Sequence, residues 1–215
     1  MGRMTETATN HAVMSLERLR EIIASPGPEA PAVRKQLPTL DVHCAAFIAK
    51  SPFLLLATSS TDGRCDVSPR GDAPGFVLML DKRTLVIPDR PGNRRLDSFQ
   101  NIIENPHAGL IFLVPNVDET LRANGRAWLS EDPALLGRMN MQGKTPQLGI
   151  VVEVEEVYFH CARAFRRANL WAPETWIERA ELPTLGKILS DQLKMVELTA
   201  EVIDDSLAES NRRLY

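Results

Sequence analysis

The sequence has no long hydrophobic run, little cysteine and no excess of positive charge. The longest apolar run, FLLLA at 53–57, is far too short to span a bilayer. The first residues are polar and then amphipathic, without the apolar centre of a signal peptide. The net charge of -3 provides no global basic field for nucleic acid. We therefore expect a cytoplasmic protein that binds neither membrane nor nucleic acid, and any anion it recognises must be held locally.

Metal-binding and nucleophile patterns are also missing. The three cysteines, Cys44, Cys65 and Cys161, are far apart, with no CxxC pair and no His/Cys cluster at zinc-like spacing. Such a sparse, odd set is typical of buried thiols in a reducing compartment. No Cys/His dyad and no carboxylate pair stands out as an acid or a base, so the sequence assigns no catalytic residue and no metal.

The chain of 215 residues is long enough for one domain of generous size. Residues 1–10 are expected to be disordered, and apolar residues at helical spacing then predict a helix over 13–23. A Pro-rich loop follows at 25–38, after which Thr39 is a candidate cap for a second helix. The last third is expected to be helical, with candidate segments at 182–195 and 202–214.

The middle of the chain is expected to be β structure. Apolar and alternating segments are separated mostly by short turns, among them the hairpin signal TDG at 61–63. We count about six strands, and their short connections favour an antiparallel barrel over alternating βαβ units. The strands are expected within seven candidate segments, of which 75–80 and 84–87 are separated only by the polar DKR: 52–58, 64–72, 75–80, 84–87, 108–114, 119–130 and 149–159.

Two adjacent arginines raise a question at the start of a predicted helix. Gly92 or Asn93 lies where an N-cap would be, so Arg94 and Arg95 would occupy the first turn. The helix dipole disfavours cations there by roughly 0.3–1 kcal/mol each. A bound phosphate would reconcile the conflict, because it accepts the free N–H groups and pairs with guanidinium. The alternative is that both arginines are solvated surface residues.

A second polar cluster lies in CDVSPRGDAPGF, at 65–76. Ser68, Arg70 and Asp72 follow one another at a strand end, between prolines and a glycine. The cluster is either part of a site or a Pro-stiffened surface turn. We discount an adhesion role for the RGD tripeptide at 70–72, since nothing else in the chain is typical of an extracellular protein.

Several blocks in the same order carry a family resemblance: DVSPRGDAPGF, LVIPDRPGNRRLDSFQNIIENPHAGLIFLVP, ETLRANGRAWLS and VYFHCARAFRRANLW. They resemble the flavin-nucleotide-binding proteins of the pyridoxamine 5'-phosphate oxidase-like superfamily, and the closing NRRLY resembles an uncharacterised bacterial subgroup. The resemblance implies an α+β fold, a six-stranded antiparallel FMN-binding split β-barrel with flanking helices. The blocks cover roughly residues 52–171. From these blocks and the pattern along the rest of the chain, we expect an N-terminal segment with a helix and the Pro-rich loop at 1–38, the split-barrel domain at 39–171, and a helical extension packed on that domain at 172–215.

The same resemblance implies one FMN per subunit, bound across a homodimer. By spacing, Asn93 and Arg94 match the family's basic pair for the FMN phosphate; Asn93 replaces a basic residue, and Arg95 is a substitute for the second charge. Further implied contacts are the strand positions Arg64, Asp66, Val67 and Ser68, the phosphate candidate Arg70, the strand end Ile87 and Pro88, and Thr120, where the family often has glutamine.

The stretch HCARAFRRANLW, at 160–171, adds further candidates. In a helix Arg163 and Arg167 share one face, and they could reach an anionic substrate or the partner's flavin. The alternative is a basic solvated helix face. Trp171 is a further candidate for the flavin site, although a tryptophan here is more often part of a core or an interface.

Three functions remain open from the sequence. The first is an FMN-dependent oxidoreductase acting on a small molecule, and the second is a non-catalytic flavin carrier, sensor or stress-response protein. The third is pyridoxamine 5'-phosphate oxidase itself, which is disfavoured because SLAESNRRLY has no match to that enzyme's C-terminal basic motif. The superfamily also uses this barrel for the deazaflavin F420 and for haem-related ligands, so the cofactor stays open too.

Overall fold

The computed structural model describes residues 12–195 and 197–215, in two compact units that span 1–36 and 37–215. The predicted disorder of residues 1–10 lies outside the described residues. In the first unit, α2 (Leu16–Ile22) begins where the Ser15 side chain accepts a hydrogen bond from Arg18 N, at 3.1 Å. A four-residue helix, α3 (Pro31–Arg34), lies in the Pro-rich stretch.

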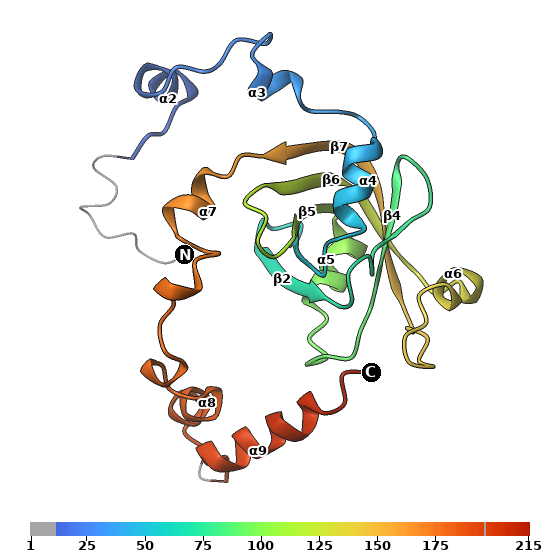
Figure 1. Cartoon of the computed structure of the whole chain (residues 1–215), viewed down its shortest axis with the longest axis vertical. Coiled ribbons are helices and arrows are strands. Elements are labelled where there is room, and N and C mark those ends of the chain that lie inside the picture. The colour runs from blue at the N-terminus through green and yellow to red at the C-terminus, as the bar shows by residue number, and fades with distance from the viewer. Residues whose placement is uncertain (1–11, 196) are drawn as a thin grey trace. The chain divides into compact units, whose positions relative to one another are not determined.

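The second unit is built on one antiparallel sheet of seven strands, in the order β2-β1-β5-β6-β7-β4-β3 (Figure 1). The α+β class and the antiparallel pairing agree with the sequence, and the TDG turn joins β1 to β2 as predicted. The strands are β1 (Phe53–Ser59), β2 (Cys65–Gly71), β3 (Leu78–Met79), β4 (Thr84–Pro88), β5 (His107–Leu113), β6 (Thr120–Ser130) and β7 (Gly149–His160).

The prediction of a six-stranded split barrel differs from the structure in two respects, the number of strands and the closure of the sheet. The seventh strand is the two-residue β3, which pairs with β4 because Asp81 closes a tight turn: its carboxylate accepts hydrogen bonds from Arg83 N (2.7 Å) and Thr84 Oγ1 (3.1 Å). The sheet is not closed, since β2 and β3 are its two edges and do not pair. Residues 72–77 join these edges as irregular chain, which leaves a seam between β2 and the end of β4.

The hydrophobic core lies on the inner face of this curved sheet. Alternate residues of each strand point inward, as the period of two requires, and Leu54, Leu56, Leu110 and Phe112 are fully buried there. Two helices complete the core: α4 (Val42–Ile48) and α5 (Asp97–Glu104). The N-cap of α4 is Asp41 rather than Thr39, because the Asp41 carboxylate accepts a hydrogen bond from Cys44 N at 2.8 Å.

The remaining helices of the second unit range from three to twelve residues in length. Strands β6 and β7 are connected through α6, and the chain after β7 is helical, as the sequence predicts. Cys44 is buried as expected, whereas Cys65 and Cys161 are exposed. Within the described ranges, no helix combines the length and apolar character that crossing a membrane requires. The elements are α6 (Pro133–Gly137), α7 (Arg163–Arg167), η1 (Pro173–Thr175), η2 (Arg179–Glu181), α8 (Leu185–Leu193) and α9 (Ala200–Asn211).

Candidate functional site

A cavity of about 1060 Å³ opens at the seam of the sheet, and we call it the seam cavity. Its walls come from β2, from the segment that follows β4, from the first turn of α5 and from the loop at 144–148. This volume is at the upper end of the range for small-ligand sites. The seam therefore creates one large cavity at the edge where the barrel fails to close.

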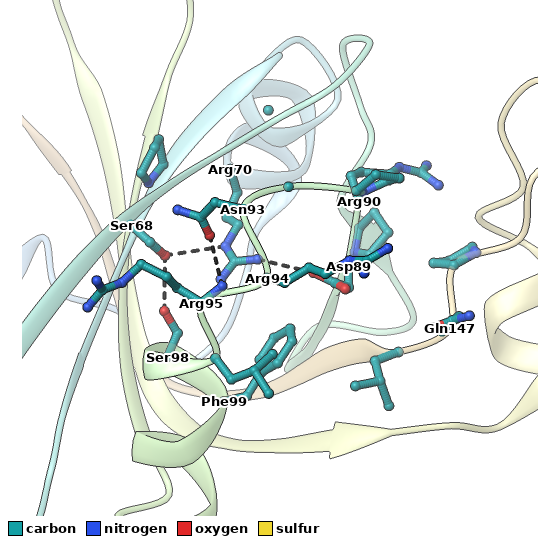
Figure 2. A pocket seen from close by; sticks show the side chains of 18 of the residues that line it. Ser68, Arg70, Asp89, Arg90, Asn93, Arg94, Arg95, Ser98, Phe99 and Gln147 are labelled. Carbon is teal, nitrogen blue, oxygen red and sulfur yellow. Dashed lines mark hydrogen bonds and ion pairs between the residues drawn. The ribbon is translucent and has the colours of Figure 1, made fainter. Parts of the chain in front are cut away.

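The most informative side chain in the seam cavity is Arg70, which Figure 2 shows among the labelled residues of the site. Its side chain is only 18% exposed. Its guanidinium lies between Ser68 and Asp89, with Nε donating to Ser68 Oγ at 3.3 Å and Nη1 donating to Asp89 Oδ1 at 3.4 Å. It also lies 5.5 Å from the ring centre of Phe99. A guanidinium has five N–H donors, so two long hydrogen bonds leave this buried charge with donor capacity for a ligand.

Burial has opposite effects on the two members of this pair. It lowers the pKa of Arg70, an effect that Asp89 and Asp66 oppose. It raises the pKa of Asp89 above its usual range, an effect that Arg70 opposes. Each group is therefore poorly solvated, and its partner offsets only part of the cost of burying the charge. An anion beside Arg70 would further stabilise the charged guanidinium.

A hydroxyl network lies beside Arg70. Ser98 Oγ donates to Asp66 Oδ2 at 2.7 Å and lies 3.1 Å from Ser68 Oγ (Figure 2). Ser98 is in the first turn of α5, while Ser68 and Asp66 are on β2. The network connects the helix start to the strand, so it holds the hydroxyl groups at a fixed place on the cavity wall.

The predicted start of the helix after β4 was wrong. Helix α5 begins at Asp97 with Leu96 as its N-cap, so Arg94 and Arg95 precede the helix instead of occupying its first turn. The residue in the first turn is the acidic Asp97, which suits the dipole. Arg95 Nε pairs with Asp97 Oδ2 at 2.8 Å and its side chain is mostly exposed. The dipole conflict that the sequence implied does not exist.

A compact loop holds the two arginines instead. Asn93 Oδ1 accepts a hydrogen bond from Arg95 N at 2.9 Å, and Arg94 has a φ of 59°, in the left-handed region that residues other than glycine rarely adopt. In the part of the chain that the structure describes, the Arg94 side chain has no hydrogen-bond or ion-pair partner. Arg94 is thus an uncommitted cation at the cavity, while Arg95 is already paired.

Eight of the sequence candidates line the seam cavity together: Asp66, Val67, Ser68, Arg70, Pro88, Asn93, Arg94 and Arg95. Two do not. The Arg64 side chain is exposed and pairs with Asp62 at 3.0 Å, and Ile87 is fully buried in the core beside Pro88. A backbone contact from Ile87 stays a prediction.

Three candidates lie at the opposite end of the sheet. Thr120 pairs with His160 at the end of β7, whereas Pro88 pairs with Gly149 at its beginning. The eleven steps between the twelve residues of β7, at about 3.3 Å each, give a path of roughly 36 Å. Arg167 is exposed in α7, and Trp171 lines a second, open pocket of about 540 Å³, with Nε1 donating to Val117 O at 3.0 Å. Within one chain, the candidates form two separate groups.

Sequence reasoning missed several residues of the seam cavity, chiefly Asp89, Arg90, Ser98, Phe99 and Tyr215. Asp89 and Arg90 directly follow the predicted strand end, and that position alone was a usable signal. The loop at 144–148 was also missed.

The RGD tripeptide at 70–72 is not displayed on the surface, because Arg70 faces the cavity and the Asp72 side chain is fully buried. Among the described residues, no group of three or more His, Cys, Asp or Glu side chains could hold a metal ion.

A comparison with known protein families identifies the family of this chain. The family model described as pyridoxamine 5'-phosphate oxidase matches residues 40–161, which is more than half of the chain and contains most of the seam cavity. The protein belongs to the pyridoxamine 5'-phosphate oxidase family, as the ordered motifs indicated. No curated protein sequence matches it.

Several solved structures are similar in part. HupZ of Group A Streptococcus is 15% identical, with a TM-score of 0.45 over 55% of this chain and 91% of that one. General stress protein 26 of Bacillus anthracis is 15% identical (TM-score 0.40; 53% and 88% covered). An FMN-binding protein of Syntrophomonas wolfei is 13% identical (TM-score 0.41; 54% and 81% covered). These likenesses decide neither ligand nor activity.

Proposed function

We propose that the protein binds FMN in the seam cavity and is an FMN-dependent oxidoreductase acting on a small molecule. The observation that carries the proposal is the buried, incompletely paired Arg70 in a large cavity of a member of this family. A phosphate monoester offers the dianionic, multi-acceptor group that such a guanidinium binds best.

The residues present fit the phosphate end of FMN. Arg70 and Arg94 would supply the positive charge, and the hydroxyl group of Ser68 would donate a further hydrogen bond. The hydroxyl proton of Ser98 is already donated to Asp66. Arg95 would contribute less, because Asp97 already neutralises it. When bound, FMN supplies reversible electron and hydride transfer, and the protein's part is to bind, orient and shield it.

A homodimer would bring the two groups of candidates together. Thr120, Arg167 and Trp171 lie at the far end of the 12-residue β7 from Pro88, beyond the reach of one mononucleotide within one chain. A second copy, placed so that this group meets the seam cavity of its partner, would complete the site. This is the shared arrangement that the resemblance implied, and it remains our proposal.

The outer face of the sheet supports such a partner. Successive strands present apolar side chains there in register, with Phe53 opposite Leu113 and Leu55 opposite both Ile111 and Pro69. These side chains are half-buried or exposed in the single chain, unlike the core residues that alternate with them. We call this set the outer apolar patch: Phe53, Leu55, Val67, Pro69, Ile111 and Leu113. A patch of this kind on a sheet face is typical of an interface.

Replacing Phe53 with glutamate should weaken dimerisation at least about tenfold, because an acidic group would be buried without a partner in the interface. The matched control is Ile103→Glu, which introduces the same charge at an exposed apolar residue of α5 outside the patch. Sedimentation equilibrium measures both. A wild-type protein that is a stable monomer with full flavin occupancy would contradict the shared site.

Redox activity has its own test. With FMN bound, an oxidoreductase should lose its flavin absorbance on anaerobic addition of NADH or NADPH and regain it on exposure to oxygen or another electron acceptor. A flavin that binds tightly yet stays oxidised with both donors, and with a broad panel of other reductants, would instead support the flavin carrier or sensor. Mass spectrometry of the released cofactor distinguishes FMN from F420 and from haem-related ligands.

A further inference from the structure

Tyr215 lies on the wall of the seam cavity, although it is 143 residues from its main partner in the sequence. Its hydroxyl donates a hydrogen bond to Asp72 Oδ1. The guanidinium of Arg90 lies 5.6 Å from the centre of the Tyr215 ring, a cation–π arrangement. Tyr215 is therefore held at the cavity by two different contacts, a hydrogen bond and a cation–π contact.

Asp72 and Arg90, the two residues that hold Tyr215, are fixed by further contacts of their own. The Asp72 side chain is fully buried and Arg90 is 15% exposed, and their Oδ2 and Nε atoms are 2.6 Å apart. Asp72 Oδ1 also accepts from Ala73 N at 2.7 Å, and Arg90 Nη2 donates to Met139 O at 3.0 Å. Burial raises the pKa of Asp72, but the hydrogen bonds from Tyr215, Ala73 and Arg90 outweigh it, so the carboxylate stays ionised.

The segment that carries Tyr215 has few other attachments. Helix α9 has no buried residue and packs against α8, where Gly186 N donates to Asp204 Oδ1 at 2.8 Å. Arg212, Arg213 and Leu214 are exposed, and Tyr215 is the half-buried residue of this stretch. Tyr215 is thus the anchor that brings the end of the segment to the cavity.

We propose that residues 212–215 form a strap anchored by Tyr215 to Asp72 and Arg90, and that a ligand leaves the seam cavity only when the strap detaches. Tyr215 itself forms part of the cavity wall, so detachment of the strap enlarges the opening. The identity of the ligand as FMN rests on the proposed function. The anchor itself rests on contacts within the chain.

The chain offers a direct probe of the anchor, because it has two tyrosines. With 3-fluorotyrosine incorporated, the ¹⁹F spectrum should have two signals, and Tyr158→Phe leaves that of Tyr215. In the ligand-free wild type this signal should differ from that of free fluorotyrosine. In Asp72→Asn, which replaces the carboxylate acceptor with an amide, it should move toward the free position.

The functional readout is the FMN dissociation rate, followed by flavin fluorescence on dilution. A hydroxyl–carboxylate hydrogen bond is a strong one, so Tyr215→Phe and Asp72→Asn should each release FMN at least about tenfold faster. Leu214→Ala, at an exposed neighbour in the strap, is the matched control and should release FMN at the wild-type rate. Tyr215→Phe keeps the test valid if Asp72→Asn does not fold.

Two results would overturn the strap: a Tyr215 signal at the free position in the wild type, or unchanged FMN release in both anchor variants. A wild type that binds no FMN contradicts the proposed function instead. In that case the ligand-free ¹⁹F signal decides the anchor alone, a shifted signal supporting it and a free one overturning it.

Discussion

Replacing Arg70 with methionine is expected to weaken FMN binding at least about 100-fold, equivalent to about 2.7 kcal/mol, and to leave riboflavin binding nearly unchanged. Methionine keeps much of the buried volume but removes the charge and every donor. Charge-assisted hydrogen bonds contribute about 1.5–3 kcal/mol each, and a guanidinium can make two to one phosphate. The loss is further increased because Asp89 would then face the phosphate without compensation.

A double-mutant cycle with Asp89 isolates that last effect. Asp89→Asn should preserve or tighten FMN binding, since Arg70 loses its 3.4 Å ion-pair partner and becomes more available. The double variant should regain part of the affinity that Arg70→Met loses. Arg95→Ala is the matched control, with a change of at most about fivefold, because Arg95 is exposed and already paired with Asp97. Equal losses for Arg70→Met and Arg95→Ala would contradict the role assigned to Arg70.

Gly125→Ala is expected to reduce the free energy of unfolding by about 3 kcal/mol or more. Gly125 lies at the bulge in β6, where the register with β7 skips Glu155. A Cβ there would overlap the carbonyl oxygen of Glu153 and lie 2.8 Å from its carbonyl carbon. Because the obstacle is backbone, no side-chain rotation can relieve it, and the two central strands must move apart.

Gly137→Ala is the control for this change. Gly137 ends α6, and a Cβ there would meet nothing within 4 Å. Alanine should be neutral or stabilise by up to about 1 kcal/mol, since it reduces the freedom of the unfolded chain. Urea denaturation measures both variants. A Gly125→Ala protein within about 0.5 kcal/mol of wild type would show that the bulge is far more pliable than the structure indicates.

The strands were predictable because apolar alternation and turn residues are local signals. The hairpin at 61–63 and the long strand β7 follow from them directly. The bulge was not, because Gly125 in an otherwise continuous strand acquires its role from β7, which is distant in sequence. Closure of the sheet was also not predictable: only residues 72–77 separate its two edges, β2 and β3, but whether these edges pair depends on how the five strands between them in the sheet curve.

The part of the candidate site that could be predicted is the part that local sequence signals specify. The cavity residues of β2 and of the loop after β4 belong to compact motifs that can be recognised in sequence. The helix start was placed too early because Asn93 can cap a helix, but its side chain instead closes a turn onto Arg95. Asp89 as the partner of Arg70, and Tyr215 as part of the wall, are tertiary contacts without a local signal.

The most direct test of the central claim is the affinity of the wild-type protein for FMN compared with riboflavin, which lacks only the phosphate. Fluorescence titration of both flavins into flavin-free protein measures the difference. Recognition of the phosphate by the buried Arg70 and the uncommitted Arg94 predicts that FMN binds at least about 100-fold more tightly. Equal affinities, or no binding of either flavin, would contradict the account.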